Sequence, residues 1–183
     1  MKENARKLTA AGMLCALAYA SSAVGRVPLV LFLKYDPKDI VIALGGLALG
    51  PLTALGVAAA ASLLELLTLS EHGVMGFLMN VISSCFFACP AALIHRRRPG
   101  LSGAAAGLLC GWGCMVSMMM LWNWLIAPIY MGVPREEVVK LLLPAFLPFN
   151  LIKGGLNGAA TLLLYRPVTA ALRLSARSRE GRP

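Results

Sequence analysis

Long apolar stretches, separated by short polar breaks, follow one another along almost the whole chain. A helix needs roughly 20 apolar residues to cross the hydrocarbon layer of a membrane, and most of these stretches approach that length. The pattern predicts an all-α integral membrane protein that crosses the bilayer about six times as a single domain, residues 1–183, with a basic tail from residue 166. The expected helices cover residues 8–25, 40–49, 52–69, 74–94, 101–130 and 144–165.

The second expected helix differs from the others in its length. Gly50 and Pro51 interrupt it after about ten residues, so it reaches only about half of the hydrocarbon layer. Short or broken helices in membrane proteins often lie beside a substrate cavity. The interruption is therefore a first indication of a binding site.

Composition supports the membrane assignment, because 58% of the residues are hydrophobic and only 14% are charged. The net charge of +9 is carried by three zones near the ends of apolar stretches. Lys and Arg in such positions mark the loops of a membrane protein that stay in the cytoplasm. Six crossings put all three zones on one side of the plasma membrane, which predicts that the N- and C-termini lie in the cytoplasm. We expect no surface that binds nucleic acid. The basic residues of these zones are Lys2, Arg6 and Lys7; Arg96, Arg97 and Arg98; and Arg166, Arg173, Arg177, Arg179 and Arg182.

All five cysteines lie inside apolar stretches, so they predict no disulfide framework. Cys85 and Cys89, like Cys110 and Cys114, are four residues apart and share a helix face, which is a spacing that can hold a metal. No His or carboxylate accompanies them at ligand spacing, so we expect these cysteines and Cys15 to be packing residues and expect no metal site.

The most informative polar residues are Asn150, Lys153 and Asn157, which share one stripe of the last expected helix. Polar groups at membrane depth are costly, and this set offers donors and an acceptor suited to an uncharged heterocycle with carbonyl groups. The alternative is that Asn150 caps the start of the helix and that Lys153 extends to the membrane surface. The residues alone leave both interpretations open.

A second set of candidates lies on the fourth and fifth expected helices. Asn123 stands between Trp122 and Trp124, where an amide and two indoles suit a flat ring, although indoles at that depth are also common membrane anchors. Gly76 and Asn80 share a helix face, so that a ligand can approach the backbone at Gly76 and bond to Asn80. Asn80 can equally bond to a neighbouring helix.

Residues 27–39 contain two prolines and balanced charges, which predicts a structured outer loop that can act as a lid. Within it we take Leu33, Tyr35 and Asp36 as lid or pocket candidates. Glu65, near the outer end of the third expected helix, is either a site residue or an interfacial charge, and the sequence favours the interfacial position.

Small residues recur every four positions on two helices. Gly12, Ala16 and Ala20 form a smooth stripe against which another helix can pack, and Gly154 and Gly158 form a similar stripe that we expect to serve internal packing. The chain contains no phosphate-binding Gly-x-x-x-x-Gly-Lys, no His-Glu-x-x-His and no Gly-x-Ser-x-Gly motif. We therefore expect neither an ATPase nor an intramembrane hydrolase.

Five motifs follow one another along the chain, at residues 32–39, 45–51, 76–80, 122–130 and 147–154. In this order they resemble the riboflavin-specific S components of energy-coupling-factor (ECF) transporters. The last of them, Leu-Pro-Phe-Asn-Leu-Ile-Lys-Gly, is the most specific to the riboflavin branch. Phe77 departs from the resemblance, since many relatives are expected to carry a carboxylate there.

The resemblance implies a six-helix subunit that captures riboflavin from the outer side, with the loop after the first helix covering the pocket. It implies ring contacts from Asn123, Asn150 and Lys153, with Gly76 and Asn80 nearby, and no cofactor. It also implies that the stripe at Gly12, Ala16 and Ala20 docks on a transmembrane coupling protein, which two ATPase subunits drive.

Three other interpretations stay open at this point. An S component for another vitamin, such as thiamine or a pantothenate-like acid, shares the fold and differs at the pocket. A metal-binding membrane protein or membrane enzyme would depend on the paired cysteines. A scaffold that only associates with other helices would be indifferent to Asn150→Ala or Lys153→Ala, whereas a vitamin-binding protein is expected to lose affinity.

Overall fold

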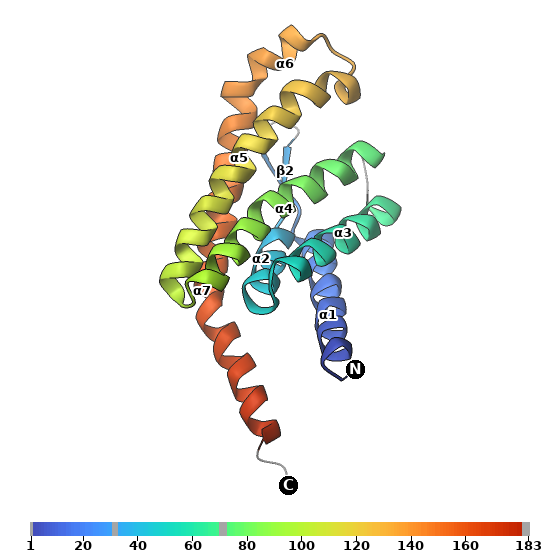
Figure 1. The fold of residues 1–183 in the computed structure, drawn as a ribbon. Coiled ribbons are helices and arrows are strands. Elements are labelled where there is room, and N and C mark those ends of the chain that lie inside the picture. The colour runs from blue at the N-terminus through green and yellow to red at the C-terminus, as the bar shows by residue number, and fades with distance from the viewer. Residues whose placement is uncertain (1, 31–32, 70–72, 181–183) are drawn as a thin grey trace.

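The computed structural model describes residues 2–30, 33–69 and 73–180, and nearly all of these residues are helical (Figure 1). The helices pass up and down between the two ends of an elongated bundle, as expected for an all-α membrane protein. The elements in chain order are α1 (Lys2–Gly25), β1 (Val27–Val30), β2 (Leu33–Tyr35), α2 (Lys38–Leu49), α3 (Pro51–Thr68), α4 (Gly73–Arg97), α5 (Leu101–Met131), α6 (Arg135–Leu141), the π-helical turn η1 (Leu142–Phe146) and α7 (Leu147–Glu180).

Five helical segments are long and apolar enough to cross a membrane, namely Lys7–Gly25, Pro51–Thr68, Gly73–Arg97, Leu101–Met131 and Arg135–Ala170. The sixth expected crossing is α2, which has 12 residues and so spans only about 18 Å. The expected short second helix is thus confirmed, and Gly50 ends it with a left-handed φ of 100°.

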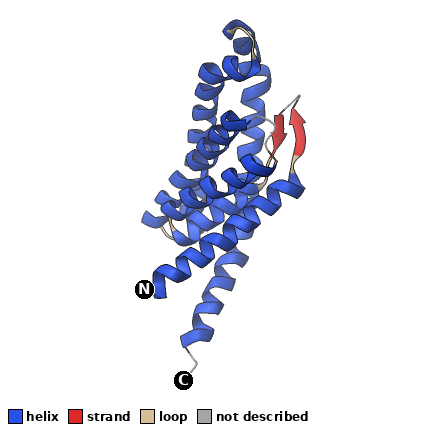
Figure 2. Ribbon diagram, turned by 90° about the vertical axis from the view of Figure 1, so that its right-hand side faces the viewer, coloured by secondary structure: helices blue, strands red, loops and turns tan. Residues whose placement is uncertain are grey.

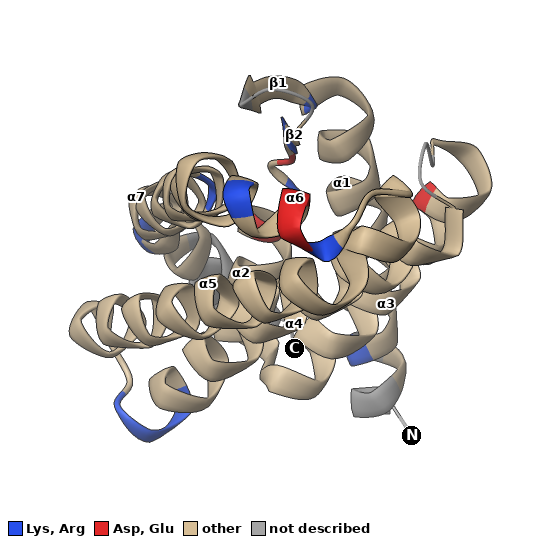
Figure 3. Ribbon diagram, turned by 90° about the horizontal axis from the view of Figure 1, so that it is seen from above, with Lys and Arg blue, Asp and Glu red and all other residues tan. Residues whose placement is uncertain are grey.

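The start of α1 and the end of α7 lie at the same end of the bundle (Figure 1). The turn between α4 and α5, which carries Arg97 and Arg98, is directed toward that end as well, and it stands out in blue at the edge of the bundle in Figure 3. The three basic zones therefore share one end of the fold, as the alternating crossings predict. That this end faces the cytoplasm stays a prediction.

Several helices extend beyond the expected boundaries. α1 begins at Lys2, α4 continues to Arg97 through Pro90, and α7 continues to Glu180 through Pro167. The sequence predicted the ends of the last two at residues 94 and 165, where the apolar pattern stops. Lys and Arg are good helix formers, so the end of an apolar stretch marks the edge of the lipid layer and not the end of the helix.

The expected outer loop forms a small antiparallel hairpin, shown in red in Figure 2. Val27 of β1 pairs with Tyr35 of β2, and the register shifts after Pro28. Strands of three and four residues are too short to show an alternating pattern in the sequence, which is why the hairpin was not predicted. At its base the chain turns directly into α2.

Between α5 and α7 the chain makes a short surface helix, α6, and then the π-helical turn η1 (Figure 1). This segment lies between the fifth and sixth helices expected from the sequence, and Arg135–Leu141 of it is helical. Pro144 lies in η1 and has no N–H to donate to a regular helix, which suits a local change of helical pitch. The turn leads into α7 just before Asn150.

The tightest packing joins α4 to α5. A Cβ atom on Gly111 would lie 2.1 Å from the backbone oxygen of Phe87, and one on Gly107 would lie 2.5 Å from that of Ala91. The glycines therefore let the two backbones touch, as small residues do between membrane helices. This contact holds the C-terminal half of α4 against α5.

Candidate functional site

A cavity of about 400 Å³ lies at the end of the bundle opposite the two termini. Its walls come from those ends of α3, α4, α5 and α7 that lie away from the termini. Arg26, directly after α1, and the hairpin strand β2 complete them. This volume lies in the range of pockets that hold drug-sized molecules. It is the best-formed pocket among the described residues.

All five principal candidates from the sequence line this cavity. Gly76 and Asn80 come from α4, Asn123 comes from α5, and Asn150 and Lys153 come from α7. Three helices that are distant in sequence thus bring their polar residues to one place. Of the further candidates, Leu33, Asp36 and Glu65 also line the cavity.

Four further candidates lie elsewhere. Tyr35 and Asn157 are joined to each other, with the Tyr35 hydroxyl donating to Asn157 Oδ1 at 2.7 Å. Trp124 faces outward with the Arg135 guanidinium 5.1 Å from its ring centre, and Trp122 is buried in packing. Successive helical residues point about 100° apart, so Asn123 can face the cavity only if its two neighbours turn away. Neither indole therefore lines the cavity, and of the two interpretations left open for them the structure does not support ring stacking on a ligand there.

Asn123 and Asn150 are held in place by their own helices. Asn123 Nδ2 donates to the carbonyl of Met119 at 2.7 Å, and Asn150 Nδ2 donates to that of Phe146 at 2.8 Å. Asn150 therefore bonds back to the preceding turn and does not cap a helix start. An amide nitrogen has two hydrogens, so each side chain keeps a second donor for the cavity.

Lys153 is buried and does not extend to the membrane surface, because only 6% of it is exposed. Its ammonium lies 3.1 Å from Asp39 Oδ2 and donates to Ser83 Oγ at 3.2 Å. A buried ammonium needs such partners, since its desolvation costs several kcal/mol. The pairing keeps a positive charge at the cavity wall.

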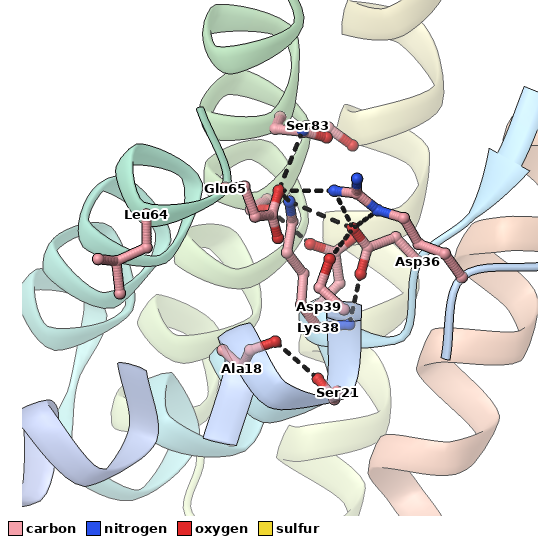
Figure 4. A network of polar contacts seen from close by, with 12 residues as sticks. Ala18, Ser21, Asp36, Lys38, Asp39, Leu64, Glu65 and Ser83 are labelled. Atoms are coloured by element: carbon pink, nitrogen blue, oxygen red, sulfur yellow. Dashed lines mark hydrogen bonds and ion pairs between the residues drawn. The ribbon is translucent and has the colours of Figure 1, made fainter. Parts of the chain in front are cut away.

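Glu65 is the centre of a second group of ion pairs, drawn in Figure 4. Its Oε2 accepts from Arg26 at 2.9 Å, from the ammonium of Lys38 and from Asn80 at 3.3 Å. Only 1% of Glu65 is exposed. The interfacial position favoured by the sequence is therefore wrong, because the partners of this carboxylate lie inside the protein.

Asp36 fastens the base of the hairpin to the helices below it. Its carboxylate accepts from Ser22 at 2.9 Å and lies 3.3 Å from both the Arg26 guanidinium and the Lys38 ammonium. Burial alone would raise the pKa of Asp36. The positive charges of Lys38, Lys153 and Arg26, together with the backbone N–H of Lys38, outweigh this effect and hold the pKa below its usual value.

The sequence analysis missed Arg26, Lys38 and Asp39 as site residues, and it placed Lys38 and Asp39 in an outer loop with balanced charges. In the structure the cations Arg26, Lys38 and Lys153 face the three carboxylates Asp36, Asp39 and Glu65, so that the charges cancel. The available signal was the position of Lys38 and Asp39 directly before an apolar helix too short to cross the membrane. In the structure both side chains are buried inside the bundle.

Lys34, Ser62, Ser83 and Tyr130 also line the cavity, but much of the remaining wall is apolar and adaptable. Met75, Met79 and Met119 contribute flexible thioethers, and Phe146 and Phe149 contribute flat rings from η1 and α7. Phe77, where the resemblance led us to expect a carboxylate, adds to this apolar wall. An apolar slot with a few fixed hydrogen-bonding groups suits a flat, uncharged ligand.

The remaining candidates lie away from the cavity. Gly12, Ala16 and Ala20 are exposed on α1, and a Cβ atom on Gly12 would meet nothing within 4 Å. Cys85 and Cys89 lie in α4, while Cys110 and Cys114 lie on the outside of α5. Among the described residues, no group of three or more His, Cys, Asp or Glu side chains is placed to hold a metal ion.

Comparison with known proteins gives three results. Residues 6–165 match the family model described as "ECF transporter, substrate-specific component". The riboflavin transporter FmnP of Bacillus subtilis (strain 168) is 30% identical over 132 residues, which are 67% of this chain and 70% of that protein. A solved structure, described as "Structure and mechanism of the S component of a bacterial ECF transporter", superimposes with a TM-score of 0.78 at 23% identity, covering 92% of this chain and 98% of the other.

Proposed function

Because this chain belongs to the family of substrate-specific components of ECF transporters, we propose that it binds riboflavin for uptake together with an ATP-driven coupling module. The observation that carries the proposal is the cavity itself. It combines an apolar wall with the amides of Asn123 and Asn150 and the ammonium of Lys153. The likeness to a riboflavin transporter over two thirds of the chain supports the same ligand.

The chemistry of the cavity matches the parts of riboflavin. The isoalloxazine ring is flat, uncharged and rich in carbonyl and ring-nitrogen acceptors, which Asn123, Asn150 and Lys153 can satisfy while the methionines and phenylalanines cover its faces. Gly76 and Asn80 border the same cavity and complete its wall on α4. The hairpin at Leu33 and Asp36 covers the opening.

The proposed coupling surface is the exposed stripe at Gly12, Ala16 and Ala20 on α1. Small side chains let a helix of a transmembrane coupling protein approach closely. Two ATPase subunits bound to that protein would supply the energy, since this chain has no phosphate-binding loop. The stripe lies on the outside of the bundle, away from the cavity.

Riboflavin binding is directly measurable. We expect the detergent-purified protein to carry a flavin absorption spectrum or to quench the fluorescence of added riboflavin. Asn150→Ala should weaken binding by about 1–3 kcal/mol, because it leaves a polar atom of the ligand unpaired. Titration of both proteins with riboflavin measures the difference.

Leu151→Ala is the matched control, since Leu151 is the next residue on α7 and is partly exposed on the outside of the bundle. It should bind riboflavin like the unmodified protein. A colourless protein that binds thiamine or a pantothenate-like acid, and no riboflavin, would contradict the proposed ligand. Equal affinities for Asn150→Ala and the unmodified protein would contradict the proposed site.

A further inference from the structure

Asp39 occupies an unusual position behind the cavity wall. It lies in the first turn of α2, is 1% exposed, and is not one of the residues that line the cavity. Both oxygens of its carboxylate are engaged. Oδ1 accepts from the Ser84 hydroxyl of α4, while Oδ2 accepts from Asn157 Nδ2 at 3.3 Å and lies 3.1 Å from the Lys153 ammonium.

These contacts fix the direction of the Lys153 ammonium. An ammonium has three hydrogens, of which one is directed to Asp39 Oδ2 and one to Ser83 Oγ. Asp39 lies on α2 and Ser83 lies on α4, and both side chains are buried. The third hydrogen is thereby left for the cavity, which both Lys153 and Ser83 line.

The charge of Asp39 also determines what kind of ligand the ammonium requires. A buried ammonium without a counter-ion favours an anionic ligand, since an anion would offset its desolvation cost. With Asp39 3.1 Å away, that cost is already offset inside the protein. The ligand then has only to supply a neutral acceptor, such as a carbonyl oxygen.

We propose that Asp39 is a positioning residue for ligand binding, which acts through Lys153 by orienting its ammonium and neutralising its charge. This inference rests on the proposed riboflavin site, and it adds a residue that does not touch the ligand. Asp39 also joins α2 to α4 and α7 through Ser84 and Asn157. A test must therefore separate an action through Lys153 from a purely structural role.

A double-mutant cycle makes that separation, with riboflavin dissociation constants measured for the unmodified protein, Asp39→Asn, Lys153→Met and the double variant. Each single variant is expected to weaken binding about tenfold or more. The double variant should bind within about twofold of Lys153→Met, because Asp39 has nothing left to position once the ammonium is absent. Losses that multiply in the double variant would overturn the proposal.

Glu65→Gln is the matched control, because it also converts a buried carboxylate of this region into an amide, but the cations paired with Glu65 are Arg26 and Lys38. Its effect on the dissociation constant should multiply with that of Lys153→Met. If it instead disappears in the Lys153→Met background, the coupling is not particular to Asp39 and the proposal fails.

Lys153→Met leaves the Asp39 charge without its ammonium, and the protein then risks failing to fold. Ser84→Ala supplies a second cycle, since it removes one anchor of Asp39 without changing any charge. Its loss of affinity, about threefold, should be present with Asp39 in place and absent in the folded Asp39→Asn background. An unchanged loss there would show that Ser84 and Asp39 act separately, against the proposal.

Failure of this inference is distinguishable from failure of the proposed function. An unmodified protein that binds no riboflavin overturns both. An unmodified protein that binds riboflavin, combined with multiplying losses in the Asp39 and Lys153 cycle, overturns the role of Asp39 alone.

Discussion

Lys38→Met is expected to destabilise the folded protein by about 3–5 kcal/mol. The Lys38 side chain is fully buried and lies between Asp36 and Glu65, so its removal takes an ion-pair partner from both carboxylates. Equilibrium unfolding in mixed micelles, followed by helical circular dichroism, measures the loss.

Lys140→Met provides the control, since Lys140 also pairs with a glutamate, Glu137 at 2.7 Å, but its side chain is 70% exposed. An exposed pair contributes little, so the unfolding free energy should hardly change. Equal destabilisation by the two substitutions would contradict the buried network, because it would mean that Lys38 is as solvated as Lys140.

Gly111→Ala is expected to cost about 3 kcal/mol of stability. The added methyl carbon would lie 2.1 Å from the backbone oxygen of Phe87, so α4 and α5 must move apart. A backbone atom cannot move aside as a flexible side chain can. The same unfolding measurement reports the effect, and riboflavin affinity should fall with it because Asn80 and Asn123 lie on these two helices.

Gly113→Ala is the matched control two residues along the same helix, where an added Cβ atom would meet nothing within 4 Å. It should leave stability unchanged or raise it slightly, because Ala favours helix more than Gly does. If Gly111→Ala proves equally harmless, α4 and α5 do not pack as closely as the structure shows.

The sequence predicted the architecture well because hydropathy acts over whole helices. Each apolar stretch has to lie in lipid or in the core of the protein. This determines the number and order of the helices even where the predicted helix ends differ from the observed ones. It also placed Asn150 and Lys153 on one stripe, since helical spacing alone decides which residues share a face. Both residues line the cavity.

The surroundings of single charges could not be predicted in this way. Lys38 and Lys140 both stand in mixed-charge segments beside apolar helices, yet one is buried and the other is exposed. The difference comes from Glu65 of α3, which reaches Lys38 although the two residues are 27 positions apart in the chain. The short helix after Lys38 is a signal that this residue is unusual, but nothing local in a single sequence identifies Glu65 as its partner.

Helix packing shows the same limit. Gly154 and Gly158 share a stripe that we expected to serve internal packing, but only Gly154 does so, since a Cβ atom there would lie 2.1 Å from the Trp112 ring. A Cβ atom on Gly158 would meet nothing within 4 Å. Spacing identifies the face, whereas the partner helix decides how far along that face the contact extends.

The half-length helix α2 lies directly behind the cavity wall, because Lys38 and Asp39 pair with Glu65 and Lys153, which line the cavity. Its first turn carries Lys38 and Asp39 with their ion pairs, and below them Gly46 packs so closely that a Cβ atom there would lie 3.0 Å from Ala54 and 3.3 Å from Ala92. A molecule in the cavity therefore meets salt bridges and then tightly packed helices. In the described bundle the cavity is closed toward the end that carries the termini. A bound molecule can therefore reach that side only when the protein itself rearranges.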